Sequence, residues 1–130
     1  MADKKVLIVD DEIHIVHVVA IKLRNNGYEV ISADNGAEAY DLALKEKPNI
    51  IVTDFQMPVM TGMQLVEKLR QNEETKDIPV IMLTARSFAI SKEEQENLQI
   101  SGCLRKPFSP KELLGNIEDI LYEKELVADN

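Results

Sequence analysis

Short apolar runs alternate with longer amphipathic stretches five times along the chain. The runs occupy residues 5–9, 28–32, 49–53, 79–84 and 102–105. The first, third and fourth are mostly aliphatic and show no polar alternation, which is typical of strands that are buried on both faces. Such strands belong to a parallel sheet covered by helices. The pattern therefore predicts a (βα)₅ doubly wound α/β domain, with five parallel strands and helices on both faces.

The stretches between the runs begin with helix-capping signals. The first helix is expected to be capped by Asp11 and to end at Gly27. The fourth is expected over residues 91–100, where only Leu98 and Ile100 can anchor it to a core. The other signals share the capping-box spacing, in which a polar cap is followed three residues later by an acid or amide. They are Asn35 with Glu38, Thr61 with Gln64, Ser91 with Glu94, and Ser109 with Glu112.

Length and charge limit the classes of function. The 130 residues fit one domain, expected over residues 1–124, with residues 125–130 as a flexible tail or the start of a linker. A net charge of −8 argues against direct nucleic-acid binding, which needs clustered cations. No apolar run is long enough to cross a membrane, and no signal peptide is visible, so a cytoplasmic protein is expected.

Polar side chains stand where the expected strands end. Asp10 and Asp11 follow the first run, Asp54 follows the third, Thr84 ends the fourth, and Lys106 follows the fifth. The carboxyl ends of parallel strands meet at one edge of a doubly wound sheet, which is where such sheets bind ligands. Three carboxylates, a hydroxyl and an ammonium group are therefore expected to lie together.

Three carboxylates at one edge need a counter-charge. Two unit charges ~4 Å apart interact by roughly 4 kcal/mol at an effective dielectric of about 20. Mg²⁺ suits a site of one or two carboxylates with phosphate and water oxygens. If Asp54 took up a phosphoryl group, the local charge of about −4 would fall to about −1 with Mg²⁺ and Lys106 present. Carboxylates are known nucleophiles for phosphoryl groups.

Four short motifs in order give the chain a family resemblance. The sequence resembles the receiver domains of bacterial two-component response regulators, which have the flavodoxin-like, chemotaxis-regulator fold, and the resemblance covers essentially the whole chain. The motifs are Val9-Asp10-Asp11-Glu12, Thr53-Asp54-Phe55-Gln56-Met57-Pro58 with Gly62, Leu83-Thr84-Ala85, and Lys106-Pro107-Phe108.

The resemblance implies a role for each site residue. Asp54 would accept the phosphoryl group. Mg²⁺, with Mn²⁺ able to substitute, would be bound by Asp11, Asp54 and the backbone carbonyl of Gln56, and by Asp10 through water. The phosphoryl and switch contacts, and the cis peptide bond expected before a proline, would involve Thr84, Ala85, Lys106 and Pro107.

The resemblance also implies partners. A histidine kinase or histidine phosphotransfer protein would supply the phosphoryl group, and a downstream protein target or fused output domain would read it. A phosphorylation-dependent homodimer is a further expectation, whereas no membrane partner is expected. The chain would catalyse only its own phosphorylation and dephosphorylation, so it is not expected to be an enzyme. Val18 and Ile21, on the side of the first helix away from its core stripe, and Phe108 form a candidate docking strip.

The sequence departs from the family pattern in three respects. Cys103 stands where receivers usually carry an aromatic switch residue, and it is expected to be a small buried hydrophobe. Gln99-Ile100 replaces the usual Gly-Ala before the fifth strand. Gln56 and Arg86, two residues beyond Asp54 and Thr84, are positioned to influence the lifetime of a phosphoryl group.

Two alternatives stay open at this point. A pseudo-receiver would keep the fold as a protein-interaction module without phosphorylation, and its site residues would have ordinary roles as caps, turns and surface charges. An aspartate-nucleophile phosphohydrolase of the haloacid-dehalogenase type is disfavoured, because it needs a second acid where this chain has Gln56. A nucleotide-binding enzyme is also disfavoured, because Asp10 and Asp11 replace the Gly-rich phosphate loop.

Overall fold

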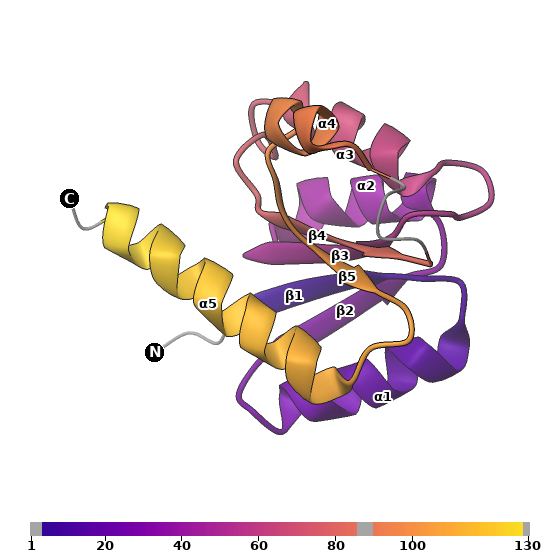
Figure 1. The fold of residues 1–130 in the computed structure, drawn as a ribbon, viewed down its shortest axis with the longest axis vertical. Helices are drawn as coiled ribbons and strands as arrows, with labels where there is room; N and C mark the ends of the chain where they lie inside the picture. The colour runs from indigo at the N-terminus through magenta and orange to yellow at the C-terminus, as the bar shows by residue number, and fades with distance from the viewer. Residues whose placement is uncertain (1–3, 86–89, 129–130) are drawn as a thin grey trace.

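One parallel sheet organises the molecule (Figure 1). The computed structural model describes residues 4–85 and 90–128, with side chains as far as residue 126. Its strands lie in the order β2-β1-β3-β4-β5, and every neighbouring pair is parallel, which confirms the predicted (βα)₅ doubly wound fold. They are β1 (Lys5–Val9), β2 (Glu29–Ala33), β3 (Ile50–Asp54), β4 (Val80–Thr84) and β5 (Ile100–Arg105).

The helices cover both faces of the sheet, with α1 and α5 on one face and α2, α3 and α4 on the other (Figure 1). Successive residues of one strand face opposite layers, so Ile8 packs with the α1 and α5 core and Leu7 packs with the α2 and α3 core. The helices are α1 (Ile13–Arg24), α2 (Gly36–Glu46), α3 (Gly62–Arg70), α4 (Lys92–Asn97) and α5 (Pro110–Ala128).

Local capping chemistry starts most helices where the sequence predicts. Side chains of Asn35, Thr61, Ser91 and Ser109 accept hydrogen bonds from the third residue beyond each cap. The prediction that Asp11 caps α1 is wrong: the cap position is Glu12, whose side chain makes no cap hydrogen bond. Asp10 accepts from the Glu12 backbone N–H at 2.9 Å instead, because the chain turns immediately after β1. Helix α1 ends at Arg24, earlier than the expected Gly27, and Gly27 takes φ +90° in the turn that follows.

The connection from α4 to β5 differs from the prediction. The helix ends at Asn97, not at residue 100, and the strand begins at Ile100, not at Gly102. Gln99 has φ +53°, which breaks the helix. Arg70 donates hydrogen bonds to the carbonyls of Leu98 and Gln99 at 2.8 and 3.2 Å, and these contacts hold the turn in place.

The last helix is long and extends past the sheet (Figure 1). It continues to Ala128, so residues 125–128, expected in the tail, are helical. The domain boundary at residue 124 stays a prediction. Within the described ranges, no helix is both long and apolar enough to span a membrane.

Candidate functional site

The structure gathers the predicted polar residues at the carboxyl edge of the sheet. Asp10 follows β1, Asp54 ends β3 and Thr84 ends β4, and all three are buried, with Asp10 2% and Asp54 8% exposed. Asp11 is exposed beside them, and Lys106 follows β5. The strands fix these positions because their register pairs β1 with β3, β3 with β4, and β4 with β5.

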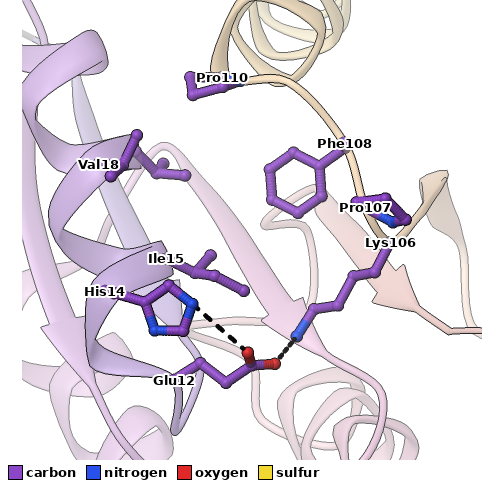
Figure 2. Close-up of a pocket in the computed structure, with 9 residues that line it drawn as sticks. Glu12, His14, Ile15, Val18, Lys106, Pro107, Phe108 and Pro110 are labelled. Atoms are coloured by element: carbon purple, nitrogen blue, oxygen red, sulfur yellow. Dashed lines mark hydrogen bonds and ion pairs between the residues drawn. The ribbon is translucent and has the colours of Figure 1, made fainter.

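Lys106 is the cation at the centre of the cluster. Its Nζ lies 2.9 Å from Oδ2 of Asp10, 2.9 Å from Oε1 of Glu12 and 3.5 Å from Oδ1 of Asp54. Figure 2 shows the lysine reaching from the β5–α5 loop toward Glu12 at the start of α1. The peptide bond between Lys106 and Pro107 is cis.

The three aspartates form a candidate set of cation ligands. One carboxylate oxygen from each of Asp10, Asp11 and Asp54 lies within 4.8 Å of the others. Oδ2 of Asp10 is buried and accepts no hydrogen bond of good geometry from the described residues, although the Lys106 ammonium lies at ion-pair distance. A buried, under-coordinated carboxylate oxygen among oxygen donors fits a hard divalent cation such as Mg²⁺.

The electrostatics of the cluster reflect this unbalanced charge. Burial, and then repulsion by Asp10, raise the pKa of Asp54, and Lys106 only partly opposes them. Burial alone would lower the pKa of Lys106, but the hydrogen bond to Glu12 and the negative charge of Asp10 at ion-pair distance outweigh it and raise that pKa. The lysine is therefore firmly cationic, whereas Asp54 holds a proton more tightly than an ordinary aspartate does.

The loop between β3 and α3 fixes the backbone that carries Asp54. The backbone N–H of Phe55 donates to the Leu83 carbonyl on β4 at 2.7 Å, and Gly62 donates back to Phe55 at 2.9 Å. Met57 anchors the loop in the core, whereas Gln56 is exposed. The carbonyl of Gln56 thus belongs to a loop that is held in place on both sides of Gln56, by Phe55 and by Met57.

At one of the switch positions the structure differs from the prediction. Cys103 is exposed, so the prediction of a buried hydrophobe is wrong. The residue pairs with Met82 in the register of the edge strand β5, and the short helix α4 that contacts this strand has no buried residue. Ala85 is exposed directly after Thr84, and Arg86 lies outside the described residues.

The candidate docking strip borders a groove beside the cluster. Val18 and Phe108 line a hollow of about 500 Å³ between α1 and the β5–α5 loop. Glu12 and Lys106 line the end of this hollow that is nearest the aspartates (Figure 2). Ile21, one turn further along α1, is an exposed hydrophobic residue, as the sequence predicts.

Glu12 was the residue that sequence reasoning missed. It belongs to the first of the four motifs, but its place there does not by itself indicate a role. Its carboxylate makes one of the two shortest ion pairs of Lys106, the other being that of Asp10. The sequence does carry a signal for it. Glu12 is the third consecutive acid after the first strand, and the residue after the fifth strand, at the same edge of the sheet, is Lys106.

Comparison with known proteins agrees with the geometry. A family model for the response regulator receiver domain matches residues 6–118. The phosphate regulon transcriptional regulatory protein PhoB of Pseudomonas aeruginosa is 36% identical over 121 residues, which cover 93% of this chain and 53% of that protein. The alkaline phosphatase synthesis transcriptional regulatory protein PhoP of Bacillus subtilis is 37% identical over 126 residues, which cover 97% of this chain and 52% of that protein. The chain thus spans about half the length of these curated relatives.

A solved structure extends the agreement to three dimensions. The chemotaxis response regulator CheY4 of Vibrio cholerae matches with a TM-score of 0.85 at 38% identity, covering 92% of this chain and 99% of that one. The family match spans most of the sequence, and the fold and motif positions agree with it. The chain belongs to the receiver-domain family of two-component response regulators, which are signalling modules and not classical enzymes.

Proposed function

We propose that this receiver domain is a phosphorylation switch in which Asp54 accepts a phosphoryl group from a histidine kinase or histidine phosphotransfer protein. One observation carries the proposal. The buried carboxylate of Asp54 stands 3.5 Å from a lysine ammonium that Asp10 also contacts, at the sheet edge where doubly wound folds bind ligands.

The transfer is a substitution at phosphorus. A carboxylate oxygen of Asp54 attacks the phosphorus of a phosphohistidine while the P–N bond breaks, and the bonding electron pair leaves with the imidazole nitrogen. The product is an acyl phosphate on Asp54. Lys106 offsets the negative charge of the incoming oxygens, and we assign the remaining phosphoryl contacts to the hydroxyl of Thr84 and the backbone of Ala85.

Asp11, Asp54 and the Gln56 carbonyl would hold Mg²⁺ directly, with Asp10 acting through water. The bound ion would supply the positive charge that three carboxylates and a phosphoryl group require. A ligand that binds only the folded state raises stability in proportion to RT ln(1 + [L]/Kd). Magnesium should therefore raise the melting temperature of the protein, and it should do so much less in Asp11→Asn, whose exposed side chain leaves the fold intact.

Intact mass spectrometry tests the central claim. After incubation with acetyl phosphate and Mg²⁺, the protein should gain one phosphoryl group, and chelation should prevent the gain. Asp54→Asn should not gain the group, whereas Asp119→Asn, which makes the same change at an exposed position on α5, should behave as wild type. No gain in the wild-type protein would favour the pseudo-receiver alternative.

We assign the output of the switch to the region after β4 and around β5, where a downstream protein or output domain would read it. Helix α4 has no buried residue, so little packing energy opposes its movement. Ala85 begins the connection to α4; residues 86–89 of that connection lie outside the described residues. Beryllofluoride with Mg²⁺ should change amide exchange over residues 91–100, and unchanged exchange there would count against this assignment.

We also propose that the groove beside the cluster receives the phosphodonor protein. Its apolar residues Val18 and Phe108 line the same groove as Lys106, so a docked donor would lie beside the site. Charge substitution at Val18 and Ile21 should slow transfer from a phosphorylated histidine phosphotransfer domain. The same double variant should react with acetyl phosphate at the wild-type rate, because this small donor needs no docking surface.

A further inference from the structure

Glu12 and Asp10 hold the Lys106 ammonium at equal distance. The Nζ atom lies 2.9 Å from an oxygen of each, and 3.5 Å from Asp54. The ammonium donates a hydrogen bond to Glu12 and forms an ion pair with Asp10, so these two carboxylates are its closest partners. In this state the lysine is turned toward α1, and its contact with the proposed phosphoacceptor is the longest of the three.

The two close contacts differ in how easily they can be given up. The Asp10 side chain is fully buried, with 0% of its surface exposed, so separating it from the lysine would leave an unpaired charge in the interior. The Glu12 side chain is 45% exposed, so water can replace the lysine there at little cost. When phosphoryl oxygens need the ammonium, Glu12 is therefore the partner that yields.

We infer that Glu12 is a positioning residue that competes with the phosphoryl group for Lys106 and holds the lysine away from Asp54 until a donor arrives. This inference rests on the proposed phosphoacceptor function. The Glu12 and Asp10 carboxylates both contact Nζ of Lys106, and of these two side chains only that of Glu12 is open to water. Glu12 thereby sets how readily a donor engages the site, whereas Asp10 stays with the lysine throughout.

Kinetics with acetyl phosphate at saturating Mg²⁺ test the competition. Glu12→Gln keeps the length of the side chain and loses its charge, and Glu12→Asp keeps the charge and loses one methylene of reach. Competition by contact predicts that both lower the KM for acetyl phosphate by about two- to fivefold, the factor that corresponds to an exposed ion pair, while kcat changes little. Glu73→Gln is the matched control, because Glu73 forms an exposed ion pair with Lys76 on the α3–β4 connection, away from the acidic cluster, and should leave KM unchanged.

The outcomes separate the inference from the proposed function. A lowered KM in Glu12→Gln alone, with Glu12→Asp equal to wild type, would mean simple charge repulsion of the donor and would overturn the inference. Wild-type KM in both variants would overturn it as well, while the proposed function would stand. A wild-type protein that takes no phosphoryl group would overturn the proposed function and this inference with it.

A second readout needs no phosphorylation. In metal-free protein, the ammonium protons of Lys106 should exchange slowly enough for detection by ¹⁵N-edited NMR, because two carboxylates hold them, and Lys106→Arg identifies the signal. The signal should broaden in Glu12→Asp and stay unchanged in Glu73→Gln. An unchanged signal in Glu12→Asp would show that Glu12 does not hold the lysine, and the inference would fail.

Discussion

The backbone carbonyl oxygen of Asp54 lies where a side chain on Gly62 would have to stand. A Cβ built on Gly62 would overlap that oxygen and would come within 2.8 Å of Sδ of Met82. The Gly62 backbone N–H also donates to the Phe55 carbonyl at 2.9 Å. The first turn of α3 is therefore packed directly against the backbone that presents the proposed phosphoacceptor.

This contact predicts that Gly62→Ala is costly. The new methyl group has to move backbone atoms of β3 or the buried Met82, and overpacking of this kind costs about 1–3 kcal/mol of unfolding free energy. Urea denaturation measures the loss. Because the shift falls on Asp54 itself, the rate of phosphorylation by acetyl phosphate should fall in the folded variant too.

Gly115 provides the control. A Cβ there meets no atom within 4 Å, and the residue lies inside α5. Gly115→Ala should raise the free energy of unfolding by about 0.5–1 kcal/mol, because alanine loses less backbone entropy in a helix. Equal effects at both glycines would show that the close approach to Asp54 carries no energetic weight.

The sheet edge was predictable because its chemistry follows from local patterns. Buried runs mark the strands, and the residue after each run lands at the same edge whatever the helices do. This rule places Asp10, Asp54, Thr84 and Lys106 without any knowledge of side-chain contacts, and the structure brings these residues together. Their roles in phosphorylation remain proposals.

The errors arose where tertiary contacts decide the outcome. The sequence predicts that α4 reaches residue 100, but Arg70, on another helix, holds the carbonyls after Asn97 in a turn. Asp11 is a good cap by type, yet the turn after β1 gives the cap position to Glu12. Burial of Cys103 depended on how far α4 covers the edge strand, which no local pattern reports.

Val59 is a strained residue beside the site. Its φ is +72°, a region that β-branched residues avoid, and its side chain is 84% exposed, so almost no packing compensates. Asparagine tolerates this conformation better, and Val59→Asn should raise the free energy of unfolding by about 1 kcal/mol. Thermal and urea denaturation measure the gain. Val18→Asn, the same exchange on helix α1, should give no gain, and stabilisation by both would trace the effect to surface polarity instead.

Arg70 ties two loops together through backbone carbonyls. Its guanidinium donates to Lys76 and Ile78 before β4, at 2.9 and 2.8 Å, and to Leu98 and Gln99 after α4. A lysine ammonium cannot donate to all four of these carbonyls, as the planar guanidinium does. The substitution Arg70→Lys therefore leaves carbonyls without donors and should lower the free energy of unfolding by about 2 kcal/mol or more. Amide exchange should accelerate first at residues 98–100, where the contacts with the α4–β5 turn are lost.

A lysine substitution at Arg24 tests whether the stability loss at Arg70 comes from its multiple hydrogen bonds. Its guanidinium donates to the Val30 carbonyl at 3.2 Å, one bond against the four that Arg70 makes to separate carbonyls. Arg24→Lys should therefore cost well under half as much as the change at Arg70, and it should leave exchange at the α4–β5 turn unaltered. Similar losses for both variants would contradict a special role for Arg70.

Cys103 is the single cysteine of the chain, so its reaction with a thiol reagent measures how accessible this position of β5 is. Although the residue is exposed, partial burial of its thiol beside β4 raises the pKa above the ordinary value. The thiolate is the form that reacts with iodoacetamide. Alkylation at a given pH near 8 should therefore be slower in the folded protein than in the same chain unfolded in urea. The midpoint of the pH dependence of the alkylation rate should also lie higher in the folded protein.

The raised pKa of Cys103 also makes the stability of the folded protein depend on pH. A thiol whose pKa is higher in the folded state binds its proton more tightly there, so its contribution to stability is full below the unfolded pKa of about 8.5. That contribution is lost as the pH rises through the folded-state value. Cys103→Ser, which has no thiol to titrate, should lose less stability than wild type over this interval in urea denaturation. Equal alkylation midpoints in folded and unfolded protein would show that the α4 face leaves Cys103 fully hydrated, and the stability difference should then vanish too.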